Sequence, residues 1–129
     1  MKKHAKSYAR QNAIYILYTK YIEKKSNIEL SSSIDDQLAL EISNYVLANE
    51  EEINTLIKPY LKKWSISELN PINLSILQIA IYELKLTDTP TKIIINEALE
   101  YAKKFSDDKS KKFIHFVLSN VVKEVRDEW

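Results

Sequence analysis

The sequence predicts an all-α protein, a compact bundle of helices. Its 129 residues contain no glycine, and this disfavours tight β-hairpins, which need positive φ at their turn centres. Apolar residues recur at intervals of three and four over long segments, which is the period of a helix buried on one side. Only Pro59, Pro71 and Pro90 interrupt these segments. A chain of this length is expected to form a single domain, residues 1–129.

A first helix is predicted over residues 4–25. Its apolar stripe consists of Ala5, Ala9, Ala13, Ile16, Leu17 and Tyr21. The polar residues 26–33 follow as a predicted loop, which separates an N-terminal from a C-terminal group of helices within the domain.

Start signals place two further helices after this loop. One of the serines at 32–33 is expected to cap the second helix, with Asp35 and Asp36 in its first turn, where the helix dipole favours acids. A third helix is predicted to begin near Asn49. Pro59 should bend or end that helix, because proline lacks the N–H that a helix interior requires.

The most apolar segment predicts the central helix of the bundle. Residues 65–68 indicate a turn or a short helix, and Pro71 suits the first turn of the helix that follows. The body of that helix, residues 74–86, is apolar around most of its circumference, so we expect it to be the most buried.

Two more helices complete the prediction. Thr89 is expected to cap the first of them, with Pro90 as its first residue and Phe105 near its end. Residues 106–110 form a polar break. The last helix is predicted over residues 111–127.

Composition excludes most enzyme classes. Without cysteine there is no disulfide, thiolate zinc site or cysteine nucleophile, and without glycine there is no phosphate loop, dinucleotide fingerprint or nucleophile elbow. The two histidines, His4 and His115, lack metal-ligand spacing. No apolar run is long enough to span a membrane and no signal peptide is evident. We therefore expect a cytoplasmic protein with no enzymatic activity, no cofactor and no metal.

Charge is unevenly distributed although the formal net charge is only +1. Residues 1–22 contain five basic residues and no acid, and residues 29–52 contain seven acids and no base. Lysines also flank Tyr60 and Phe113. Cations interleaved with aromatic rings suit single-stranded RNA, but periodicity alone favours the reading that these rings are core residues and the lysines a solvated face.

A series of motifs resembles the NusB family over nearly the whole chain. They are ILQIAIYEL at 76–84, Asp88-Thr89-Pro90, INEALEYAKKF at 95–105 and SKKFIHFVL at 110–118, preceded by Ala9-Arg10, Ala13, Leu17 and Tyr18. The resemblance implies about six to seven helices in two packed helical subdomains. It also implies a transcription antitermination factor, which binds the boxA element of ribosomal RNA leader transcripts together with ribosomal protein NusE. With other Nus factors, the pair helps RNA polymerase to read through terminators.

The resemblance also implies an RNA-binding face and shows where this chain departs from the family. The implied residues are Lys2, Lys3, Lys6, Arg10, Tyr18, Tyr60, Lys63, Lys112 and Phe113. The arginine-rich start of the family is mostly lysine here, and Gln78 replaces the usual arginine. Lysine makes no bidentate phosphate fork, so we expect RNA binding that is salt-sensitive and dependent on a partner. The resemblance assigns no individual residue to NusE.

Two other functions remain open from the sequence. The chain is also compatible with a stand-alone NusB-like RNA-binding module, related to the N-terminal domains of rRNA cytosine methyltransferases. A third hypothesis is a helical protein-interaction scaffold, in which the acidic segment 29–52 docks a basic partner.

Overall fold

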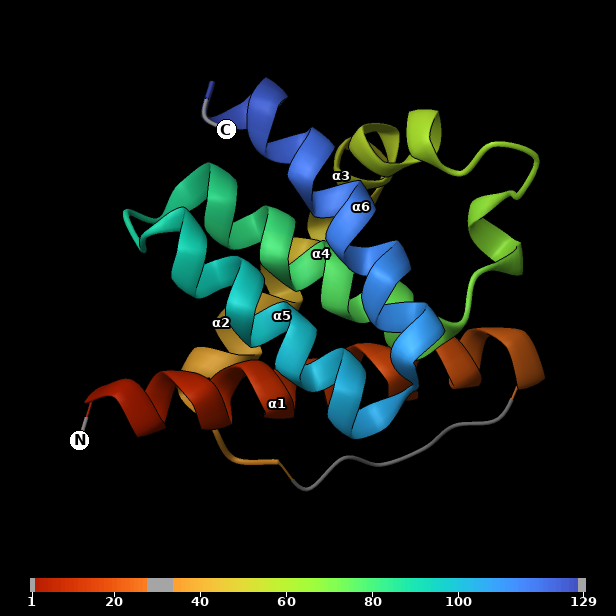
Figure 1. The fold of residues 1–129 in the computed structure, drawn as a ribbon. Helices are drawn as coiled ribbons and strands as arrows, with labels where there is room; N and C mark the ends of the chain where they lie inside the picture. Colours follow the sequence, from red (N-terminus) through yellow and green to blue (C-terminus); the bar gives the residue numbers. More distant parts are fainter. Residues whose placement is uncertain (1, 28–33, 128–129) are drawn as a thin grey trace.

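The computed structural model describes residues 2–27 and 34–127, with side chains from Lys6 onward in the first helix. These residues form six α-helices and two 3₁₀ turns, without a strand, so the predicted all-α class is confirmed (Figure 1). The elements are α1 (Lys2–Ser26), α2 (Gln37–Ala48), α3 (Glu50–Ile57), η1 (Lys58–Tyr60), η2 (Ile66–Glu68), α4 (Pro71–Leu86), α5 (Thr91–Phe105) and α6 (Asp108–Val125).

Helix α4 is the centre of the molecule, as its sequence predicts. It packs against the other five helices, and its side chains from Asn73 to Ile81 are all buried. α1 and α2 form one closely packed pair and α5 and α6 another, while α3 contacts both α2 and α6. The apolar side chains of these helices form one continuous core that includes Ile53, Leu77 and Leu118.

Helix α1 runs along one edge of the bundle, and its C-terminal end lies near η2 (Figure 1). Its middle is covered by the turn between α5 and α6, and its ends extend past this turn in both directions (Figure 1). The buried stripe follows the prediction, since Ala9, Ala13 and Leu17 are at most 4% exposed. Toward the two ends of the helix, the same side carries exposed lysines, Lys6 at one end and Lys20 and Lys24 at the other.

Two acidic N-caps shift the helix starts from their predicted positions. Asp36 is the N-cap of α2 rather than a residue of its first turn, because its carboxylate accepts the Ala39 N–H at 3.0 Å. The serine cap predicted at 32–33 lies outside the described residues. Asp107 caps α6 by accepting the Ser110 N–H at 2.7 Å, so α6 begins before the predicted residue 111.

Two predictions involving proline had different outcomes. α3 ends at Ile57, and Pro59 lies in the 3₁₀ turn η1, as expected of a residue that stops a helix. The start predicted for α5 is wrong by one residue. Pro90 occupies the N-cap position in place of Thr89, and no side chain caps this helix.

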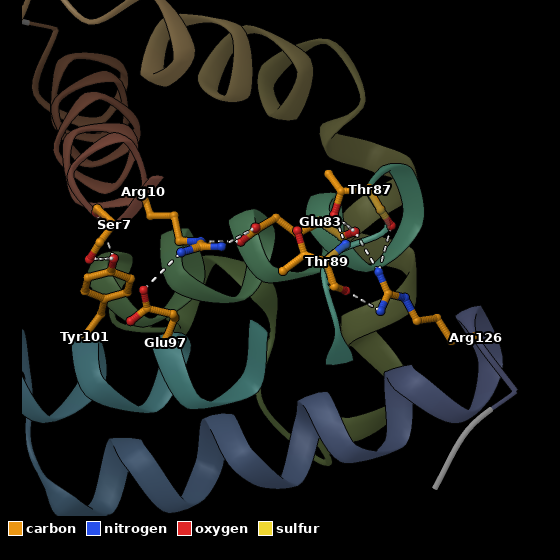
Figure 2. Close-up of polar contacts among 8 residues, drawn as sticks. All are labelled: Ser7, Arg10, Glu83, Thr87, Thr89, Glu97, Tyr101 and Arg126. Carbon is orange, nitrogen blue, oxygen red and sulfur yellow. Dashed lines mark hydrogen bonds and ion pairs between the residues drawn. The ribbon is translucent and has the colours of Figure 1, made fainter. Parts of the chain in front are cut away.

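Arg126 joins the end of α6 to the connection between α4 and α5 (Figure 2). Its guanidinium donates to the carbonyl oxygens of Glu83, Leu84, Thr87 and Thr89, at 2.7–3.2 Å. It also donates to the Thr91 hydroxyl at 3.0 Å. A single side chain therefore bonds to the last turn of α4, including the Leu84 carbonyl that the helix end leaves without a backbone partner, and to the connection that follows.

Candidate nucleic-acid interface

The basic start of α1 projects from one end of the bundle. Lys6 is exposed there. Lys2 and Lys3 belong to the same helix, but their side chains lie outside the described residues.

Arg10 lies one turn further along and has a different environment. Its side chain is buried and forms a bidentate ion pair with Glu83, at 2.7 Å from Nε to Oε2 and 2.8 Å from Nη2 to Oε1. Nη1 also contacts Glu97 Oε1 at 3.0 Å (Figure 2). Burial by itself lowers the pKa of Arg10, but the hydrogen bonds and charges of the two glutamates outweigh it and raise the pKa. A guanidinium engaged in this way is not available to a phosphate, although the sequence placed Arg10 on the RNA face.

The seam between α1 and α5 holds the basic end of α1 in place. The Tyr101 hydroxyl donates to the Ser7 carbonyl oxygen at 2.8 Å and lies 3.1 Å from the Ser7 hydroxyl (Figure 2). Lys104 Nζ donates to Gln11 Oε1 at 3.1 Å. Burial raises the pKa of Tyr101, so this hydroxyl stays protonated and able to donate. These contacts bring Lys6 beside the C-terminal half of α5.

An aromatic groove of about 340 Å³ lies where the α5–α6 turn crosses α1. Tyr15, Tyr18, Ile72 and Phe105 line it, and Tyr15 and Phe105 are 56% and 39% exposed. Phe105 stacks on Tyr101 and has Lys104 Nζ 5.3 Å from its ring centre. No lysine or arginine is among the residues that line the groove itself, so it is an apolar recess beside a basic edge.

The other predicted residues meet along α6. Lys112 is exposed, whereas Phe113 is half-buried against the core. Tyr60 packs edge-on against Phe116 at 6.3 Å between ring centres. Since Lys112 and Phe116 are four residues apart, they lie on one side of α6, and Tyr60 therefore shares that side with Lys112. Lys63 is exposed beyond η1.

The structure thus joins some predicted residues and adds others. Lys6 and Tyr18 lie along α1, while Tyr60 is packed against the α6 side that carries Lys112. Sequence reasoning missed Tyr15 and the α5 sequence Lys103-Lys104-Phe105. The signal was available, because two lysines followed by phenylalanine is also the pattern of residues 111–113.

Within 2–27 and 34–127, His, Asp and Glu form no cluster of three suited to a metal ion. No helix in the same ranges has the length and apolar character needed to cross a bilayer.

The fold and this surface define a small helical protein with a lysine-rich, aromatic face of the type that contacts nucleic acid. The model of the NusB family matches residues 7–123. The chain belongs to the NusB family.

Curated relatives agree with this assignment. The transcription antitermination protein NusB of Listeria innocua is 36% identical over 121 residues, which cover 90% of this chain and 94% of the relative. The protein of the same name from Macrococcus caseolyticus is 46% identical over 88 residues, or 68% of each chain.

Solved structures share the fold. T. maritima NusB aligns with a TM-score of 0.74 at 27% identity, covering 92% of this chain and 90% of that one. A complex of the antitermination factors NusB and NusE with dsRNA also contains a chain with a TM-score of 0.74. At 23% identity, with 94% and 98% of the two chains covered, this second match shows the fold alone.

Proposed function

We propose that this protein is a transcription antitermination factor that binds boxA-type RNA of ribosomal RNA leader transcripts together with ribosomal protein NusE. With other Nus factors it would promote read-through by RNA polymerase. It acts in the cytoplasm as one RNA-binding domain, by binding and without a catalytic step or cofactor. Its family membership and the names of its relatives support this function, as does the shared fold of a NusB that was solved with NusE and RNA.

The observation that carries the proposal is the distribution of cations. The chain has only two arginines, and both make contacts within the fold. The exposed cations on α1, α5 and α6 are therefore lysines, including Lys6, Lys104 and Lys112. Lysines bind phosphates as point charges, and the adjoining rings offer faces for unpaired bases.

The proposed RNA surface follows from these positions. Its phosphate contacts are Lys2, Lys3, Lys6, Lys63 and Lys112, with Tyr60 and Phe113 beside them. Arg10 is left out as a direct contact because it is buried, and we assign it the role of holding α1 against α4 and α5.

The aromatic groove suits the protein partner better than the RNA backbone. Exposed apolar patches on a protein surface mark sites of protein contact, and no cation lines this one. We therefore place an apolar side chain of NusE between Tyr15 and Phe105. Tyr18 lines the same groove, so we assign it to this contact rather than to RNA.

The test is binding of labelled boxA RNA and a scrambled RNA, with and without NusE, over a salt series. Lys6→Glu should weaken binding to both RNAs and reduce the salt slope by about 0.7, because one phosphate contact of a single-stranded RNA is lost. Lys92→Glu, an exposed lysine at the start of α5, is the matched control. Equal affinity for boxA and scrambled RNA under both conditions would contradict the proposal.

The scaffold hypothesis has less support, because part of its acidic segment is already engaged. Asp36 caps α2 and accepts the Asn12 amide at 2.9 Å, and Glu52 forms an ion pair with Lys85. No contact of the described residues favours the methyltransferase-like module.

A further inference from the structure

A second and larger groove lies at the opposite end of α1 from Lys6. It has a volume of about 780 Å³ and is bounded by α1, α2, α3, η2 and α4. This volume is within the roughly 300–1,000 Å³ of small-ligand sites. The contacts assigned above to RNA and NusE use none of its residues.

The groove has lysines on one wall because the core-facing side of α1 becomes basic near its C-terminal end. Lys24 lies 18 residues after Lys6, about five turns, so the two share one side of the helix. Lys20 lies one turn before Lys24 on that side. In the middle of the helix this side is occupied by Ala13 and Leu17, which are 0% and 4% exposed. Toward the C-terminal end of α1, the same side presents Lys20 and Lys24 to the groove.

The remaining walls combine apolar, aromatic and amide groups. Tyr21 lines the groove from α1, with Lys25 Nζ 5.8 Å from its ring centre. Leu47 closes another side. At the base, Gln78 Nε2 donates to Asn54 Oδ1 at 3.0 Å, and both amides line the groove.

The charge of the lining favours an anionic ligand. The lining residues include three lysines, Lys20, Lys24 and Lys25, and one carboxylate, Glu50. Lys20 also has Glu23 Oε1 at 3.5 Å, but its side chain remains 56% exposed. An aromatic ring and apolar side chains beside cations suit a planar base that carries a phosphate.

We propose that this groove binds a single-stranded segment of the same RNA, flanking the part that contacts Lys6 and the start of α6. Lys20 and Lys24 hold its phosphates, and a base lies against Tyr21. α1 connects the two surfaces, with about 27 Å between Lys6 and Lys24 along the helix axis. This inference rests on the proposed function and adds a second RNA contact to it.

The experiment compares a boxA element alone with the same element extended by a run of uridines on either side. The wild-type protein should bind one extended RNA more tightly than the element alone. Lys20→Ala with Lys24→Ala should abolish this gain. The same double variant should lower the salt slope for that RNA by about 1.4, which corresponds to two phosphates at about 0.7 each. It should leave binding of the element alone unchanged.

Two further variants keep the result specific. Lys92→Ala with Lys123→Ala removes two exposed lysines from elsewhere and should leave the gain intact. Ser67→Trp fills the groove from its exposed rim without changing charge and should also abolish the gain. Circular dichroism and thermal unfolding should show that all variants are folded.

The outcomes separate the two proposals. If the wild-type protein binds the element alone and the extended RNAs equally, the groove proposal is overturned while the proposed function stands. If Ser67→Trp weakens binding of NusE and not of extended RNA, the groove serves a protein and the proposal is likewise overturned. If the element alone does not bind even with NusE, the proposed function itself fails.

Discussion

At the scale of single residues, the contacts of the two arginines determine which cations are left for RNA. Arg10 links α1 to α4 and α5 through Glu83 and Glu97, and Arg126 links α6 to the α4–α5 connection. Both use the planar fork of donors that lysine lacks. Arginine thus occupies the two positions that make several directed hydrogen bonds, whereas lysine occupies the exposed positions that supply only charge.

Glu83→Ala should destabilise the protein by about 3–5 kcal/mol, because it leaves the buried guanidinium of Arg10 without its bidentate partner. Urea unfolding followed by circular dichroism measures the change. Glu97→Ala should cost less, since Glu97 makes one contact and is partly exposed.

The double variant Arg10→Met with Glu83→Leu is the control for Glu83→Ala. Removing both charges avoids the unpaired cation, so much of the lost stability should return. A loss below about 1 kcal/mol for Glu83→Ala would show that the ion pair does not hold α1 in place.

The role of Arg10 could not be read from α1 alone. Its spacing from Lys6 places the two on nearby positions of the helix, and only the packing of α1 on α4 distinguishes them. A signal did exist in α4, where Glu83 is the single acid in a segment otherwise predicted to be buried. A buried carboxylate needs a cation, and Arg10 supplies it.

At the scale of elements, the sequence predicted the helices better than their starts. Periodicity located every helix, because long apolar stripes average over many residues. The starts depend on one hydrogen bond each, and an aspartate is equally acceptable at the N-cap and in the first turn. Asp36 and Asp107 therefore turned out to be caps.

Asp36→Ala should cost about 1 kcal/mol, because it removes the cap of α2. The pKa of Asp36 lies below its ordinary value, chiefly because its carboxylate accepts the Ala39 N–H and then the Asn12 amide. The stabilisation is therefore fully present above the unfolded pKa and is lost as pH falls through the folded one.

Asp36→Asn separates the cap from its charge. Asparagine caps about as well, so stability near neutral pH should change little, while the loss of stability below about pH 4 should become shallower. Urea midpoints over a pH series measure both effects. If the stability of Asp36→Asn falls as steeply at acid pH as that of the wild-type protein, the assigned contribution of the Asp36 charge is contradicted.

Arg126→Ala should destabilise the protein by about 1.5–3 kcal/mol through loss of the charged hydrogen bonds at the end of α4. Arg126→Lys should retain only a small part of the stability that Arg126→Ala loses. One ammonium cannot reach all the carbonyls that the guanidinium contacts with three nitrogens. Thermal unfolding measures both variants, with Lys123→Ala as the exposed control. If Arg126→Lys is as stable as the wild-type protein, a positive charge alone is sufficient for this stabilisation and the directed hydrogen bonds are not needed.

At the scale of the whole molecule, the absence of glycine and the helical periodicity were sufficient to predict the class, and the motif series the family. The grooves could not be predicted, because each is formed by elements distant in sequence. The aromatic groove brings Tyr15 and Tyr18 of α1 to Ile72 and Phe105, and the larger one brings the C-terminal end of α1 to residues of α2, α3, η2 and α4.

A surface whose cations are lysines should bind RNA less tightly than one with arginines, because an ammonium group cannot form two parallel hydrogen bonds to a phosphate. Lys6→Arg with Lys112→Arg should therefore tighten binding of boxA RNA by a factor of roughly three, because each guanidinium can form two parallel hydrogen bonds to a phosphate. The slope of log affinity against log salt should not change, since the number of neutralised phosphates is the same. Fluorescence anisotropy over a salt series measures both quantities, with Lys92→Arg as the control. Tighter binding accompanied by a steeper slope would mean that new phosphates are contacted, and unchanged affinity would mean that neither lysine lies on the RNA path.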